Sequence, residues 1–212
     1  MKKNYDLLTL VQLAMLICIQ LVMKAIGLGS VPVGPLYMSF LTLPIAVAAI
    51  IIGPAGGAIT GAVFGLVSFK DALTGGSVMT STLLGVSPIH TFILCVVTRT
   101  LMGFLTGVVY SLVKKLDHKR TWSLFVGSIA APLLNTLLFM GYICLVFYHT
   151  DYVQGLVNTL GVSNPFAFVV ALVGMQGLIE AVAVGVVGGI VCKALSAFLG
   201  GQPANMTVNR IV

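Results

Sequence analysis

Long apolar stretches alternate with short polar ones along almost the whole chain. Six of them are long enough, or nearly so, to cross a membrane as helices, for which about 20 residues are needed. Gly, Pro or charged residues separate them, and these residues end helices or avoid lipid. We expect the spans at about residues 7–27, 36–52, 56–69, 88–113, 122–148 and 165–199. The second and third are short, which favours a tilted or broken crossing.

The composition fits a protein that lies almost wholly in the membrane. Of the 212 residues, 58% are hydrophobic and only 8% are charged, whereas soluble domains carry about 25% charged residues. This excludes a soluble domain, a disordered chain and a nucleic-acid-binding module. We therefore expect residues 1–212 to form a single integral membrane domain, an all-α protein of six transmembrane helices.

The positions of the basic residues predict which way the chain crosses. If the N-terminus is inside, the outer side holds only Lys24 and Lys70. The inner side then holds Lys2, Lys3, Lys114, Lys115, Lys119, Arg120, Lys193 and Arg210. This bias predicts that both termini are cytoplasmic. The irregular stretches 27–35, 70–87 and 149–164 would then share the outer face, which indicates a lid over an outward cavity.

Arg99 is a charged residue inside a predicted membrane span. It lies roughly 16 Å along the fourth span from Pro88, at about 1.5 Å per residue, and so near mid-membrane. A central Arg costs at least about 2.5–3.5 kcal/mol on insertion, so its side chain should face protein or water. Its guanidinium matches a carboxylate and would anchor an anionic ligand. The alternative is a buried ion pair with a neighbouring helix.

Three further polar residues are expected at a similar depth. Glu180 in the sixth span is the natural partner for Arg99, or it accepts a hydrogen bond from a ligand, and the two roles can coexist. Gln176 lies one turn away on the same helical face. Asn135 in the fifth span can bind a polar ligand or bond to another helix. The candidate substrate-binding residues are thus Arg99, Asn135, Gln176 and Glu180.

Small residues recur at four-residue spacing in two of the predicted spans. Gly57, Gly61 and Gly65 form a ridge in the third span, and Ala14 and Cys18 form a weaker one in the first. Such ridges let a neighbouring helix approach closely. We interpret these five residues as a contact surface for a partner protein, with packing inside the bundle as the alternative.

Enzyme motifs and metal-ligand patterns are absent from the sequence. There is no Walker motif, HExxH or GxSxG, so we expect neither ATP hydrolysis by this chain alone nor another enzymatic activity. The four cysteines lie in apolar runs without CxxC spacing, which indicates no metal site. No cofactor is expected.

Several segments resemble those of one family of membrane transport proteins. They are PLYMSFLTLPIAVAAIIIGPAGGAITGAVFGLVSF (Pro35–Phe69), TRTLMG (Thr98–Gly103), LNTLLFMG (Leu134–Gly141) and IEAVAV (Ile179–Val184). Together with the six-span layout, they resemble the substrate-binding (S) component of energy-coupling factor (ECF) vitamin transporters over Leu7 to Leu199. The most specific part is the series Pro44, Gly53-Pro54 and Gly61, followed by a polar outer loop.

The resemblance is closest to the pantothenate-type members, in which an Arg, an Asn and a Glu recur in the last three spans. These would be Arg99, Asn135 and Glu180. It implies a high-affinity capture subunit for a small carboxylated vitamin in a prokaryotic plasma membrane. It also implies partners, namely a transmembrane coupling subunit and two cytoplasmic ATPases. Many members meet the coupling subunit through an Ala-xxx-Ala motif in the first span, here Ala14-xxx-Cys18. A stand-alone secondary transporter of a small anionic solute is the alternative, with Glu180 as its proton carrier.

Overall fold

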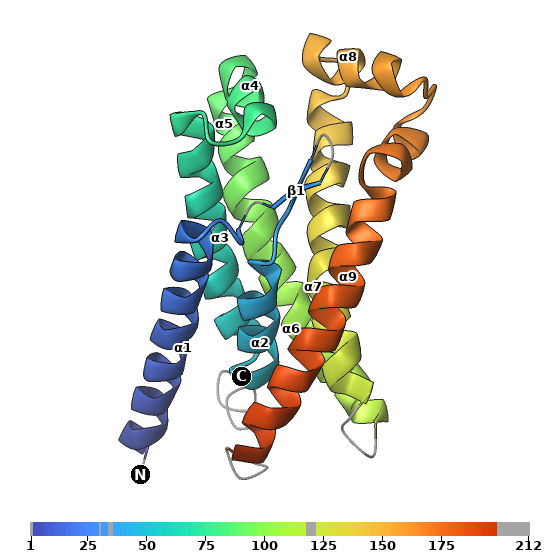
Figure 1. Ribbon diagram of the computed structural model, residues 1–212. Coiled ribbons are helices and arrows are strands. Elements are labelled where there is room, and N and C mark those ends of the chain that lie inside the picture. Colours follow the sequence, from blue (N-terminus) through green and yellow to red (C-terminus); the bar gives the residue numbers. More distant parts are fainter. Residues whose placement is uncertain (1, 30, 34–35, 118–121, 199–212) are drawn as a thin grey trace.

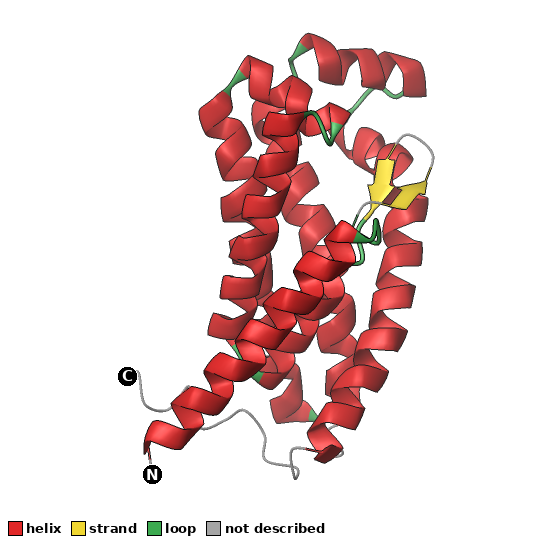
Figure 2. Ribbon diagram, turned by 60° about the vertical axis from the view of Figure 1, so that its left-hand side comes forward, coloured by secondary structure: helices red, strands yellow, loops and turns green. Residues whose placement is uncertain are grey.

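The protein is a bundle of long helices, with the short helices α4 (Val78–Val86), α5 (Pro88–Phe92) and α8 (Asp151–Leu160) toward one end (Figures 1 and 2). The computed structural model describes residues 2–29, 31–33, 36–117 and 122–198, without the side chains of residues 2–6, 31–33, 36–38 and 175–176. The elements are α1 (Lys2–Ala25), β1 (Val31–Val33), β2 (Leu36–Met38), α2 (Thr42–Ile51), α3 (Pro54–Thr74), α4 (Val78–Val86), α5 (Pro88–Phe92), η1 (Ile93–Val97), α6 (Thr98–Leu116), α7 (Trp122–Tyr142), η2 (Ile143–Phe147), α8 (Asp151–Leu160) and α9 (Pro165–Phe198). Both η1 and η2 are π-helical segments that continue directly into or out of a long α-helix.

Four stretches of the described residues are long and apolar enough to cross a membrane. They are Leu7–Ala25, Pro88–Leu116, Trp122–Phe147 and Gly177–Phe198. A fifth results if α8 and the first part of α9, which meet at 73°, count as one broken span. The helical membrane class predicted from the sequence is therefore confirmed, and six remains the predicted number of spans.

The N- and C-terminal ends of the long helices lie at opposite ends of the bundle in a regular pattern. In Figure 1, the start of α1, the end of α6, the start of α7 and the end of α9 all lie at the lower end, and α4 and α8 lie at the upper end. The basic residues at or near these lower ends are Lys2, Lys3, Lys114, Lys115 and Lys193. Gathering of positive charge at one end is the distribution expected of a cytoplasmic face, and the cytoplasmic placement of the termini stays a prediction.

The expected second span, residues 36–52, was wrong in its first part. Leu36–Met38 forms a strand that pairs antiparallel with Val31–Val33, with Val31 opposite Met38. A short apolar run suits a strand as well as a helix, so hydropathy alone could not place the boundary. The helix α2 begins only at Thr42, and Pro44 falls in its first turn, where its missing N–H breaks no helical bond. With ten residues, nearly all buried, α2 is an internal helix of the bundle.

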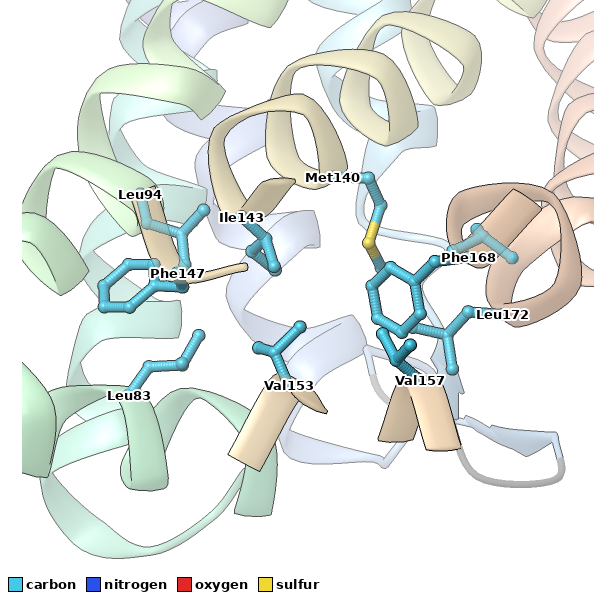
Figure 3. Close-up of a cluster of buried hydrophobic side chains, with 10 residues drawn as sticks. Leu83, Leu94, Met140, Ile143, Phe147, Val153, Val157, Phe168 and Leu172 are labelled. Carbon is cyan, nitrogen blue, oxygen red and sulfur yellow. The ribbon is translucent and has the colours of Figure 1, made fainter. Parts of the chain in front are cut away.

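The predicted outer stretches 70–87 and 149–164 are largely helical. They contain the end of α3, all of α4 and all of α8. On α8, Val153 and Val157 lie one turn apart and are buried against side chains of α7, η2 and α9 (Figure 3). This α8 cluster consists of Leu83, Leu94, Met140, Ile143, Phe147, Val153, Val157, Phe168, Leu172 and Val173. Through it α8 covers one end of the bundle.

The glycine ridge of α3 packs against α6 of the same chain. A Cβ added at Gly61 would meet the carbonyl oxygen of Arg99, and one added at Gly57 would meet that of Gly103. Gly65 is buried along the same line, which we call the α3–α6 seam. The expectation that these three glycines face a partner protein is wrong, because α6 covers Gly57 and Gly61 and η1 covers Gly65. Their function is to let two helices of this chain touch backbone to backbone.

Helix α1 lies at the edge of the bundle, and Figure 2 shows it running obliquely across the front. Both Ala14 and Cys18 are exposed on it. Among the described side chains of α1, Gln20 is the buried one, and its Nε2 donates to the carbonyl oxygen of Thr60 at 3.4 Å. Near the end of α1, Nζ of Lys24 lies 2.6 Å from Oδ2 of Asp71. Most of the apolar surface of α1 is left for lipid or for another protein.

Candidate functional site

A cavity of about 110 Å³ lies inside the bundle. Its walls come from the turn before α2 and from α3, α4, α6, α7 and α9, and they consist of Ser39, Phe64, Met79, Arg99, Asn135, Thr136, Phe139, Met140, Val173 and Glu180. Met140 and Val173 also belong to the α8 cluster, so this cluster borders the cavity. A cavity of about 150 Å³ can hold benzene, so this one is on the scale of a small organic group.

The guanidinium of Arg99 is buried at this cavity, and the residue is 7% exposed. Its Nη1 donates to the carbonyl oxygen of Cys95, one turn earlier, at 3.2 Å. Its Cζ lies 4.5 Å from the centre of the Phe64 ring on α3 and 4.7 Å from that of Phe139 on α7. Aromatic faces attract a cation, most of all where water is excluded. Two rings and one carbonyl thus surround the charge.

Glu180 reaches the same cavity from α9 and is 6% exposed. The hydroxyl of Thr42, the first residue of α2, lies 3.1 Å from Oε1 of Glu180 and donates to it. The same hydroxyl lies 3.2 Å from the carbonyl oxygen of Ser39. Because Thr42 is fully buried, this bond fixes the side of the cavity at which the Glu180 carboxylate sits.

Arg99 and Glu180 do not form an ion pair. Among the described residues, the oppositely charged groups within 4.0 Å of each other are those of Lys24 and Asp71. Of the two roles expected for Arg99, ligand anchor and ion-pair partner of Glu180, the structure therefore disfavours the second. A buried cation left without an acidic partner is costly to maintain. Its presence at a cavity is what an anion-binding site requires.

Three buried polar atoms at the cavity have no hydrogen-bond partner within the described chain. They are Oγ of Ser39, Nε of Arg99 and Oδ1 of Asn135. Buried polar atoms are nearly always bonded, and each exception calls for an explanation such as a missing ligand or water. Three such atoms around one space indicate that a polar molecule completes their bonding. The Ser39 hydroxyl can donate or accept a hydrogen bond, the charged Nε–H of Arg99 donates, and the amide oxygen of Asn135 accepts.

The comparisons identify the family of the chain. A family model described as the substrate-specific component of ECF transporters matches residues 8–192. The chain belongs to this family. As an ECF substrate-specific component it is a membrane transport subunit for a small molecule, works with other ECF components and is not an enzyme. A comparison with curated proteins gave no match.

The structure brings together three of the four predicted binding residues of this ECF component. Arg99, Asn135 and Glu180 line one cavity although they come from three helices. Gln176 lies on α9, and its side chain is outside those described. The sequence did not single out Thr42, Ser39 or the two rings that cover Arg99. Only the polar Thr42 and Ser39, set in a long apolar stretch, gave a signal that could have drawn attention.

Proposed function

We propose that this ECF component captures pantothenate, or a vitamin of similar size and charge, for uptake across a prokaryotic plasma membrane. The observation that supports it best is the guanidinium of Arg99, buried at a cavity without an acidic partner among the described residues. Carboxylates are the ligands that a guanidinium matches with two parallel hydrogen bonds. Pantothenate also carries an amide and hydroxyl groups, which suit the remaining polar atoms of the site.

The four candidate binding residues then have separate roles. Arg99 holds the carboxylate, and Asn135 accepts a hydrogen bond from an amide or hydroxyl group through its unpaired Oδ1. Glu180, held by Thr42, accepts from a ligand hydroxyl on its own side of the cavity. Gln176, one turn from Glu180 on α9, is proposed as a fourth contact.

The subunit would work with a transmembrane coupling subunit and two cytoplasmic ATPases. We propose that Ala14 and Cys18 belong to the contact with the coupling subunit. Both are exposed on α1, whose surrounding apolar side chains are also exposed, as those of Val11 and Met15 are. Small residues one turn apart leave room for a foreign helix.

Native mass spectrometry of the detergent-purified protein tests the ligand class. A tightly held vitamin is expected to copurify at one molecule per chain, with a mass that fits a small carboxylic acid. Calorimetric titration with pantothenate should then give saturable binding. A copurified ligand without a carboxylate would contradict the proposal.

Uptake into proteoliposomes tests whether the chain is a capture subunit or a complete transporter. The chain alone is expected to bind the vitamin without accumulating it, even with a proton or sodium gradient. Adding the coupling subunit, the ATPases and ATP should start accumulation. Gradient-driven accumulation by the chain alone would instead establish a secondary transporter.

Replacing Thr42 with valine tests how Glu180 is held. The change removes the hydroxyl and keeps the shape, so the carboxylate is free to turn toward Arg99 and compete with the ligand. A hydrogen bond to a charged group contributes at least about 1.5 kcal/mol, so we expect calorimetry to show pantothenate binding weakened about tenfold. Thr42→Ser, which keeps the hydroxyl, is the matched control and should bind nearly as the wild type. Equal affinities in the two variants would show that the hydroxyl does not matter.

A further inference from the structure

The proposed function does not explain why the rings of Phe64 and Phe139 lie over the guanidinium of Arg99. The hydrogen-bond acceptors that the described residues supply to its guanidinium both belong to Cys95, namely the carbonyl oxygen and the thiol sulfur, although the group has five N–H donors. Nε has no hydrogen-bond partner among the described residues. An acidic residue in contact would have stabilised the charge but would also have occupied these donors. The chain places aromatic faces there instead.

We propose that Phe64 and Phe139 are positioning residues of the substrate site, which stabilise the buried charge of Arg99 and leave its unpaired N–H groups available to a carboxylate. The proposal rests on the proposed function, since it assumes that the ligand is an anion. The faces of aromatic rings are electron-rich and stabilise a cation without accepting its N–H groups. A carboxylate can therefore bind Nε and a neighbouring N–H group without first displacing a protein partner.

The placement of the rings supports a positioning role. Phe64 is 4% exposed on α3, next to the α3–α6 seam, and Phe139 comes from α7. The two rings thus restrain the guanidinium from two helices other than its own. Nη1 donates to Cys95, whereas Nε is buried without a hydrogen-bond partner among the described residues, so a ligand that reaches the guanidinium would complete its bonding. Glu180 stays apart, bound to Thr42.

A spectroscopic test needs no ligand. The chain has only three arginines, Arg99, Arg120 and Arg210, so ¹⁵N-arginine labelling gives three Nε–H signals, and Arg99→Lys identifies one of them by its loss. Protons above aromatic faces are shifted upfield by ring currents. We expect the Arg99 signal to be the upfield one and to move toward the other two in Phe139→Leu and in Phe64→Leu. A wild-type signal that coincides with the others, or that neither variant moves, would overturn the proposal.

A binding test separates positioning from packing. Calorimetry with pantothenate and with its primary amide compares an anion with a neutral ligand of the same shape. In Phe64→Leu and Phe139→Leu we expect pantothenate to bind about tenfold more weakly and the amide to change less than about twofold. Phe139→Tyr, which keeps an aromatic face, should restore most of the pantothenate affinity. Equal losses for both ligands would mean that the rings only pack the bundle, and no loss would mean that they have no role in binding.

Phe168→Leu provides the matched control. Phe168 is fully buried in the α8 cluster and is not among the residues that line the cavity. It should lower thermal stability without changing the ratio of the two affinities. If wild-type protein binds neither pantothenate nor the amide, the proposed vitamin is wrong, and the Nε–H signal of Arg99 still decides on the role of the rings.

Discussion

Arg99→Lys is expected to weaken pantothenate binding about ten- to hundredfold. An ammonium group cannot form the two parallel bonds that a guanidinium makes with a carboxylate. Losing a charge-assisted hydrogen bond costs about 1.5–3 kcal/mol, and about 1.4 kcal/mol corresponds to a factor of ten in affinity. Calorimetric titration of the purified variant measures the loss. The primary amide of pantothenate should bind wild type and variant with similar affinity, because it lacks the charge that Arg99 recognises.

The double variant Arg99→Met/Glu180→Gln separates recognition from charge neutralisation. If Arg99 served only to balance Glu180, removing both charges together would leave a folded protein that binds normally. The two groups are not within ion-pair distance, and each has its own partners in the chain. We therefore expect the double variant to fold and to have lost pantothenate binding. Affinity near that of the wild type would show that Arg99 has a structural role only.

Gly61→Ala is expected to damage both stability and binding. The new Cβ would meet the carbonyl oxygen of Arg99 across the α3–α6 seam, so α6 has to move at the residue that we propose holds the carboxylate. Overpacking of this kind costs about 1–3 kcal/mol of folding stability. Thermal unfolding in detergent should show a lower midpoint, and calorimetry should show pantothenate binding reduced at least about tenfold, equal to about 1.4 kcal/mol. Gly61→Leu should be more severe in both respects.

Gly141→Ala controls for the effect of replacing a helical Gly with Ala where no neighbour is close. A Cβ at this position in α7 would have no neighbour within 4 Å. Because Ala favours the helix over Gly by up to about 1 kcal/mol, this variant should be as stable as the wild type or slightly more so, with unchanged binding.

If Gly61→Ala lowered transport by the full complex but left binding and stability intact, the glycine ridge of α3 would be a partner surface after all.

The sequence predicted the helical class and the residues of the site better than it predicted packing. Charged and amide groups in apolar runs are expensive in lipid, so Arg99, Asn135 and Glu180 stand out, and the structure places all three at one cavity. The glycine ridge was recognised as a close-contact surface, but spacing says nothing about which helix makes the contact. The partner, α6, became known only from the fold.

Other features of the fold and the site could not be predicted from a single sequence. Phe64 and Phe139 are two of eleven phenylalanines in an apolar chain, and only their distance to Arg99 separates them from residues that face lipid. The strand Leu36–Met38 looked like the start of a helix because short apolar runs fit both structures. Tertiary contacts decide both cases.

The π-helical segment η1 changes which way the helix that carries Arg99 faces. A regular α-helix turns about 100° per residue, so His90 and Arg99, nine residues apart, would point to opposite sides. A π turn holds one extra residue, which brings the two directions to within about 80° of each other. Both side chains do contact α7: Nδ1 of His90 lies 2.9 Å from the hydroxyl of Tyr142, and Arg99 lies over Phe139. The extra residue in η1 therefore lets His90 of α5 and Arg99 of α6 both contact α7.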